Sequence, residues 1–290
     1  MTRSMNGIGI DGATTRRATS AAPAPGQIVL VFQGGGALGA YQAGVYQALH
    51  EAGIEPDWII GTSIGAINAA LIAGNEPKDR LPKLKEFWDR MAYKEFWHSS
   101  SAWPQLSQTL SCLNTVTRGI PGFFEPNSMA YWGNHVVLGA ERAGYYSTAP
   151  LEKTLSELVD FSMLNRCKPR LTVGAAHVRT SQMRYFDGRE TEIGVKHILA
   201  SGALPPAFPA VRIEGELYWD GGILSNTPTE IIFDDNPRRD SLILPCTCGT
   251  PWVRSRRRCG RSRIARRTSS IRAASPATSP AKCRPIACAT

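Results

Sequence analysis

A serine flanked by glycines offers the clearest chemistry in the sequence. Gly61, Ser63 and Gly65 form a Gly-x-Ser-x-Gly pattern between a short apolar segment and an apolar, alanine-rich one. This pattern is typical of a nucleophile elbow, in which small flanking residues permit a sharp strand-to-helix turn that exposes the serine hydroxyl. A helix that begins after Ser63 would aim the positive end of its dipole at the site, with the Ile64 N–H as one oxyanion donor. We therefore expect Ser63 to act as a nucleophile.

A glycine cluster, residues 34–39, precedes this motif. Glycines at a strand-to-helix turn let backbone N–H groups converge on an anion, which could be a phosphate or a developing oxyanion. Gly34, Gly36 and Gly39 also match the Gly-x-Gly-x-x-Gly fingerprint of dinucleotide-binding Rossmann proteins. That fold needs an acidic residue at the end of the next strand, whereas Asp57 precedes the apolar residues of that strand. The dinucleotide-binding interpretation is therefore the weaker alternative, and the lack of a following Gly-Lys-Ser/Thr excludes a P-loop.

The base that would activate the serine is less obvious. A usual α/β-hydrolase triad places its histidine last in the chain, after the acid. The five histidines are His50, His98, His135, His177 and His197. None of them follows Asp220, so a Ser–Asp pair is the economical interpretation, with His197 as an alternative base. Asp187 and Asp220 both precede a glycine, and because Asp-Gly is also a common turn pair, spacing alone does not choose between them.

The segments around these residues predict strands that alternate with helices. Predicted strands cover 27–33, 57–60, 171–178 and 182–187, predicted helices cover 40–53, 66–74, 77–91, 195–201 and 227–233, and a hairpin-like pair covers 211–219. Strand, turn and helix in this rhythm are typical of a parallel α/β sheet. Residues 77–146 hold 12 of the 24 aromatic residues. They indicate either core packing under long loops or an apolar wall or lid over an acyl-chain site.

Charge and cysteine divide the chain into three parts. Residues 246–290 contain 11 of the 33 basic residues, none of the 24 acidic ones and five of the seven cysteines, so residues 1–245 carry 22 basic and 24 acidic side chains. A tail with this composition cannot bury a core and favours disorder or a shifted reading frame over a nucleic-acid arm or a zinc module. We expect a disordered leader over 1–26, one α/β domain over 27–245, and a protein of the cytoplasm, since no apolar run of membrane-spanning length occurs.

Four blocks of the sequence resemble the patatin-like phospholipase family. They are residues 34–39, residues 61–65 with Ala66 and Asn68, residues 201–209, and Asp220–Gly222 with Asn226 and Pro228. The resemblance spans about residues 28–232. It implies a three-layer α/β/α fold with a mainly parallel central sheet, and hydrolysis of ester-linked acyl chains by a Ser–Asp dyad. Many family members carry Arg or Lys where this chain has Leu38, and related bacterial proteins continue past the aspartate block in ordinary globular sequence, unlike the tail here.

Carried over by motif, the resemblance makes Ser63 the nucleophile and Asp220 the base. The oxyanion hole would be formed by the backbone of Gly34, Gly35 and Gly36, and the supporting glycines would be Gly39, Gly61, Gly65, Gly221 and Gly222. The expected reaction forms an acyl-enzyme that is then hydrolysed, with no metal or cofactor. Because a free aspartate has a pKa of about 3.9, we expect burial to raise the pKa of Asp220. The expected partner is a lipid or phospholipid, with peripheral membrane contact and no nucleic acid; a lipid-binding or scaffold protein that has lost catalysis is the alternative.

Overall fold

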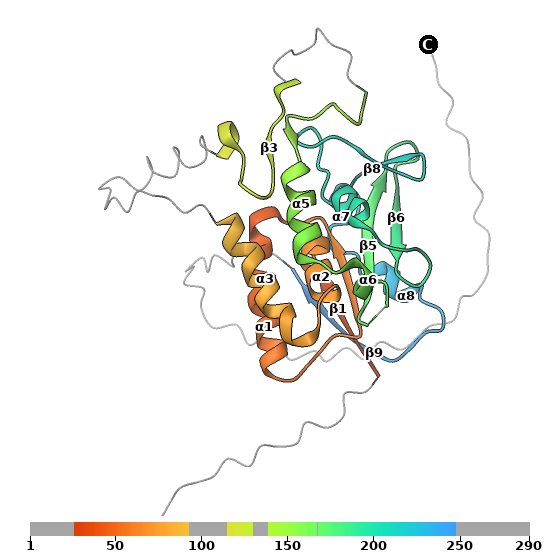
Figure 1. The fold of residues 1–290 in the computed structure, drawn as a ribbon. Coiled ribbons are helices and arrows are strands. Elements are labelled where there is room, and N and C mark those ends of the chain that lie inside the picture. The colour runs from red at the N-terminus through yellow and green to blue at the C-terminus, as the bar shows by residue number, and fades with distance from the viewer. Residues whose placement is uncertain (1–25, 93–114, 130–138, 167, 248–290) are drawn as a thin grey trace, which may run out of the picture. The chain divides into compact units, whose positions relative to one another are not determined.

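The computed structural model describes residues 26–92, 115–129, 139–166 and 168–247 (Figure 1). The chain divides into two units, residues 1–249 and 250–290, and all described residues belong to the first. Nearly all of the predicted leader and tail therefore lies outside the described residues.

A seven-stranded, mostly parallel sheet forms the centre of this unit. The strands run in the order β7-β8-β5-β2-β1-β9, with β6 paired to β5. Strands β5, β2, β1 and β9 are mutually parallel, whereas β6, β8 and β7 pair antiparallel. The strands of this sheet are β1 (Gln27–Phe32), β2 (Trp58–Thr62), β5 (Arg170–His177), β6 (Gln182–Asp187), β7 (Val211–Ile213), β8 (Glu216–Asp220) and β9 (Ser241–Cys246). The predicted mixed α/β fold with a mainly parallel sheet is confirmed.

Two strands share one edge of β5. Strand β6 pairs with residues 172–177 of β5, so β2 and β8 must both use the opposite edge. Strand β2 occupies the first part of that edge and ends with Thr62 opposite Gly174. Strand β8 occupies the rest from the other direction and ends with Asp220 opposite Ala175. The ends of β2 and β8 therefore meet at neighbouring positions of β5, although they lie far apart in the sequence.

Side chains alternate between the two faces of the sheet, as the two-residue period of a strand requires. Leu30, Phe32 and Ile59 join the main core, on the face of the sheet over which helices α1, α2, α3 and α5 lie (Figure 1). Trp58 and Ile60 face the other side, where Ile232 of α8 covers them. The helices are α1 (Ala40–Glu51), α2 (Ile64–Ala73), α3 (Pro77–Met91), α5 (Ala149–Leu158), α6 (Phe161–Leu164), α7 (Val195–Ser201) and α8 (Glu230–Phe233), with 3-10 turns η1 (Gly36–Gly39) and η3 (Gly221–Ile223) and a small ribbon of β3 (Glu125–Pro126) and β4 (Tyr146–Ser147). None of these helices is long and apolar enough to cross a bilayer, within the part of the chain that the structure describes.

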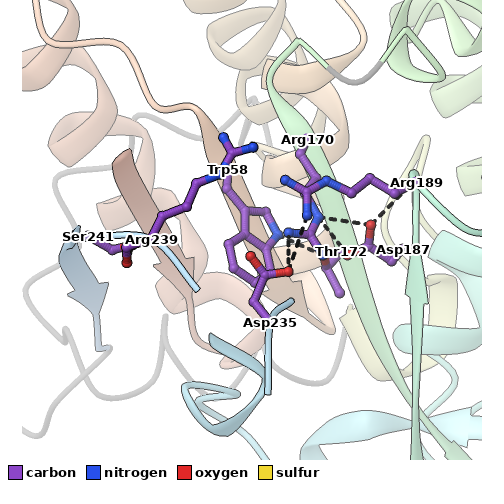
Figure 2. A network of polar contacts seen from close by, with 8 residues as sticks. All are labelled: Trp58, Arg170, Thr172, Asp187, Arg189, Asp235, Arg239 and Ser241. Carbon is purple, nitrogen blue, oxygen red and sulfur yellow. Dashed lines mark hydrogen bonds and ion pairs between the residues drawn. The ribbon is translucent and has the colours of Figure 1, made fainter. Parts of the chain in front are cut away.

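A buried network of polar contacts closes the second face near the start of β5 (Figure 2). The Arg170 guanidinium lies 3.9 Å from the centroid of the Trp58 ring and pairs with Asp187 and Asp235, at 2.8 Å each. The Trp58 indole donates to the Thr172 hydroxyl at 2.7 Å, and that hydroxyl donates to Asp187 at 2.5 Å. These contacts fasten the segment that follows α8 to the sheet.

Most predicted elements are confirmed, with α3 and α7 at the predicted bounds. The hairpin over 211–219 forms as β7 and β8. Helix α8 begins only at Glu230, later than predicted. Strand β9 was not predicted, and it extends to Cys246, one residue into the predicted tail.

Candidate active site

Ser63 lies between the last residue of β2 and the first residue of α2. Its backbone has φ 56° and ψ −127°, a conformation that a side-chain-bearing residue rarely adopts and that costs about 1–3 kcal/mol. The flanking glycines are sterically required: a Cβ at Gly61 would lie 2.5 Å from the Gly65 carbonyl oxygen, and one at Gly65 would lie 2.3 Å from the Phe32 carbonyl oxygen. This is the tight backbone shape that a nucleophile elbow needs.

Asp220 ends β8 and is only 3% exposed. Its Oδ1 accepts a hydrogen bond from the Gly222 N–H at 2.7 Å. Burial raises the pKa of this carboxyl above its ordinary value, and hydrogen bonds from the Ser63 side chain and the Gly222 backbone offset only part of the rise. The expected direction of the shift is confirmed. The carboxylate thus sits beside the Ser63 hydroxyl in a site that makes it a stronger base than a free aspartate.

The structure separates the two aspartates that spacing could not distinguish. Asp187 lies opposite Thr172, near the start of β5, and Arg170 and Thr172 occupy its carboxylate. His197 is buried and its Nδ1 accepts from the Gly194 N–H, while its ring packs on Phe186. Burial lowers the pKa of this imidazole. No contact of His197 with the serine is found among the described residues.

The remaining histidines do not supply a base either, as far as they are described. His50 bonds to Glu55, and His177 bonds to Thr180 and lies 3.3 Å from Glu216. His98 and His135 lie outside the described residues.

The glycine loop packs against the Asp220 block and the Ser63 motif. The Gly34 N–H donates to the Asn226 carbonyl at 3.1 Å, and the Asn226 side-chain amide donates back to the Gly34 carbonyl at 3.1 Å. A Cβ at Gly34 would lie 3.1 Å from the Ser63 Cβ, so the loop approaches the serine closely. Since its N–H is engaged by Asn226, Gly34 is the weakest of the predicted oxyanion donors. Gly35 and Gly36 are exposed and lie at the start of η1.

The other predicted site glycines lie where close packing leaves no room for a side chain. A Cβ at Gly39 would lie 2.6 Å from Ile64 Cγ1, and one at Gly221 would lie 2.5 Å from the Gly174 carbonyl oxygen. A Cβ at Gly222 would lie 3.0 Å from the Asp220 carboxylate. These glycines let the glycine loop, the Ser63 motif and the Asp220 block approach one another.

The geometry argues against a dinucleotide site. Asp57 lies before β2, at the end of the sheet away from the glycine loop, and its carboxylate accepts from the Ile28 N–H at 2.8 Å. The acidic group is therefore engaged and at the wrong end of its strand to hold a ribose. Among the described residues, no group of three or more His, Cys, Asp or Glu side chains could hold a metal ion.

Buried amides that the sequence analysis did not assign support the loop. Asn68, on α2, is fully buried; its amide donates to the Gly39 carbonyl at 3.0 Å and to Gln42 at 2.8 Å, and it accepts from the Trp88 indole at 3.1 Å. Gln42 in turn donates to the Gln33 carbonyl at 2.7 Å. Asn68 is the one polar residue in the otherwise apolar sequence of α2, and this pattern could have predicted its supporting role.

The aromatic wall is tested only in part. Six of the twelve aromatic residues in 77–146 are described. Of these, Phe124 meets Phe208 edge to face and Tyr146 meets it at a tilt, so they pack the 201–209 loop against the neighbouring ribbon. A separate hollow of about 940 Å³ between α3 and α5 is lined by none of the predicted site residues. An acyl-chain wall stays a prediction.

The chain is similar to several known proteins over part of their length. The chain is 35% identical to a lysophospholipase, nte1, of Aspergillus terreus over 127 residues, which is 41% of this chain and 8% of that protein. It is 25% identical to a cGAMP-activated phospholipase of Pseudomonas aeruginosa over 254 residues, 81% of this chain and 65% of that protein. The crystal structure of VipD from Legionella pneumophila aligns with a TM-score of 0.39 at 18% identity, over 70% of this chain and 47% of that one. The chain thus spans less than two thirds of these relatives.

A family model describes the matched region directly. The model for patatin-like phospholipases matches residues 30–233, which covers most of the chain and includes the glycine loop, the Ser63 motif and the Asp220 block. This protein therefore belongs to the patatin-like phospholipase family.

Proposed function

We propose that this protein is a lipid acyl hydrolase that cleaves ester-linked fatty acyl chains, with Ser63 as nucleophile and Asp220 as base. The observation that carries the proposal is the placement of the buried Asp220 carboxylate beside the Ser63 hydroxyl, where β8 and β2 meet on one edge of β5. A base with a raised pKa next to a serine held in a strained turn is suited to nucleophilic catalysis at neutral pH.

The proposed reaction has two halves. Ser63 Oγ attacks the ester carbonyl carbon as its proton moves to Asp220, and the resulting alkoxide of the alcohol leaves with that proton. Asp220 then takes a proton from water as the resulting hydroxide attacks the acyl-enzyme carbonyl carbon. The bond from that carbon to Ser63 Oγ breaks, Asp220 returns the proton to Ser63 Oγ, and the fatty acid is released.

Backbone amides would stabilise the negative oxygen that forms in both halves. The Ile64 N–H has no acceptor within α2, because the first four N–H groups of a helix lack partners in their own helix. We assign it, with Gly35 and Gly36, as the oxyanion donors, each of which typically contributes about 2.7–4 kcal/mol to transition-state stabilisation. Gly34 would contribute less, since its N–H already donates to Asn226.

Exposed apolar side chains around these segments support a lipid substrate. Five of the eleven large apolar residues exposed in the described part of the chain lie in or next to three of these segments: the glycine loop, residues 201–209 and the Asp220 block. They are Leu38, Tyr41, Leu204, Ile223 and Leu224. Apolar side chains beside a nucleophile suit contact with acyl chains at a phospholipid surface, and we propose peripheral membrane contact there.

The activity is tested with a short-chain chromogenic ester. Wild type should release the chromophore, whereas Ser63→Ala and Asp220→Asn should be reduced to background. Ser181→Ala is the matched control, since Ser181 is also a serine with positive φ, at 53°, but lies in a turn outside the site. Equal rates in wild type, Ser63→Ala and Asp220→Asn would refute the dyad and favour the alternative of a lipid-binding or scaffold protein without catalysis.

The lipid surface is tested with phosphatidylcholine vesicles. Leu224→Gln should slow the hydrolysis of vesicles and leave hydrolysis of the soluble ester unchanged. Leu242→Gln is the control, because Leu242 is equally exposed, at 46%, but lies on β9 opposite Ile28, at the start of β1. If both variants hydrolyse vesicles like wild type, the Leu224 surface has no part in lipid contact.

A further inference from the structure

The Ser63 backbone is held by a second serine that is distant in the sequence. The Ser63 N–H donates to the Ser201 hydroxyl oxygen at 2.9 Å. The Ser201 hydroxyl oxygen also lies 2.6 Å from the Gly174 carbonyl oxygen of β5. Ser201 is the last residue of α7 and is fully buried. A relay of two hydrogen bonds therefore links the nucleophile, α7 and the central strand.

The chemistry of the two partners fixes the direction of this relay. A backbone N–H can only donate and a backbone carbonyl can only accept, so the Ser201 proton must point to Gly174 and its lone pair must face Ser63. The hydroxyl cannot rotate away without leaving one buried partner unsatisfied, which is costly. Ser201 thus presents a fixed acceptor to the residue whose backbone is strained.

The same end of α7 also holds the base. Ala203, two residues after Ser201, accepts the Asp220 N–H at 3.0 Å. One short segment therefore fixes the backbone of both members of the proposed dyad, Ser63 through a side chain and Asp220 through a carbonyl. The Ser201 contact is the one that a substitution can remove without altering the main chain.

We propose that Ser201 is a positioning residue, which keeps the Ser63 hydroxyl aligned with Asp220 and with the oxyanion donors by anchoring the Ser63 N–H. This inference rests on the proposed acyl hydrolase function. Ser201 is fully buried, so we do not expect it to touch a bound substrate. Its loss should therefore affect the transition state and leave ground-state binding of the substrate nearly unchanged.

The test measures kcat and KM of the soluble ester in Ser201→Ala and Ser201→Cys. Both variants should lower kcat by about 10- to 100-fold, the range expected for a misplacement of about 1 Å at a reacting group, with KM changed by less than about twofold. Cysteine is slightly larger than serine and leaves no cavity, but it is a poor hydrogen-bonding group, so it remains informative if the alanine variant does not fold. The rate of covalent labelling by a fluorophosphonate, followed by mass spectrometry of the Ser63 peptide, should fall in parallel.

The matched control is Thr154→Val. Thr154 is also buried, and its hydroxyl donates to the Gly122 carbonyl at 2.8 Å, but it contacts neither member of the dyad. We expect a loss of thermal stability in this variant with kcat unchanged.

The outcomes separate the two proposals. Wild type that is no faster than Ser63→Ala would refute the hydrolase function itself. An active wild type with wild-type kcat in the folded Ser201 variants would overturn the positioning role alone. A kcat loss of equal size in Thr154→Val, or a Ser201 effect on KM only, would also overturn it.

Discussion

Replacing Gly65 with alanine should push the start of α2 away from the sheet and move Ser63 with it. The added Cβ would lie 2.3 Å from the Phe32 carbonyl oxygen and 2.7 Å from the Phe32 carbonyl carbon, where ordinary contact begins at 3.4 Å. The Phe32 backbone cannot move aside, because β1 is paired to β2 on one side and to β9 on the other. Helix α2 must therefore shift by about 1 Å.

The size of both effects follows from this shift. Overpacking costs about 1–3 kcal/mol, and a clash with fixed backbone belongs at the upper end. Alanine recovers less than about 1 kcal/mol of helix propensity, because Gly65 lies in the first turn of α2. We expect a net loss of about 2 kcal/mol in the free energy of unfolding. Since Ser63 caps α2, kcat should fall about 100-fold as well.

Urea denaturation and ester hydrolysis measure the two effects, with Gly44→Ala as the matched control. Gly44 lies within α1, and a Cβ there would meet no atom within 4 Å. That variant should gain about 0.5–1 kcal/mol of stability and retain wild-type kcat. Gly65→Ala with wild-type stability and rate would refute the steric account of the Gly-x-Ser-x-Gly motif.

Three further predictions concern the base, the second face and the glycine loop. Asp220 must be ionised to act as a base, and burial raises its pKa. As the pH decreases, kcat/KM should therefore begin to fall at a pH above the ordinary aspartate pKa of about 3.9. A kcat/KM that stays constant down to pH 4 would contradict this. The folded state also binds that proton more tightly than the unfolded state, so the free energy of unfolding falls as pH rises through the raised pKa, and Asp220→Asn should remove this slope in pH-dependent urea titrations. Arg170→Leu removes a cation shared by two buried carboxylates, of which Asp187 keeps Thr172 and Asp235 keeps Arg189. It should therefore cost about 3 kcal/mol in urea denaturation, the lower end for a broken buried ion pair, while kcat of the folded protein stays unchanged; a loss below about 1 kcal/mol would show that the network does not hold the second face. Asn226→Ala removes one hydrogen bond to Gly34 and should lower kcat about tenfold in the ester assay, equivalent to about 1.4 kcal/mol; an unchanged kcat would mean that the loop keeps its position without this side chain.

Local sequence patterns predicted much of the fold and many of the candidate residues. The amphipathic spacing of α3 and the glycines around Ser63 are signals that lie within a few neighbouring residues, and they predicted these elements well. Strand β9 has no such context, since it follows a polar segment and runs directly into the basic tail. Its place beside β1 is decided by the tertiary packing of apolar side chains.

The contacts that position the site could not be predicted from one sequence. Ser201 and Asn226 act on residues 138 and 192 positions away, and a serine or asparagine of this kind is more often an ordinary turn or cap residue. Spacing alone did not distinguish Asp220 from Asp187, whereas the family resemblance favoured Asp220. The physical difference between them is the part of β5 that each aspartate lies opposite. Sequence alone supplies the residue types, whereas the pairing of distant strands decides which of them meet.

The pairing of β2 and β8 with the same edge of β5 also determines how local unfolding would separate Ser63 from Asp220. Movements of the sheet as a whole carry Ser63 and Asp220 together, because each residue follows or ends a strand that is hydrogen bonded to β5. Within the sheet their separation grows when β8 detaches, and β8 is held to β5 by a ladder of three residue pairs, Tyr218–Asp220 against Ala175–His177. Such short ladders open at lower free energy than the global fold. Heat should therefore abolish catalysis by local fraying of β8, at temperatures where the rest of the sheet is still intact.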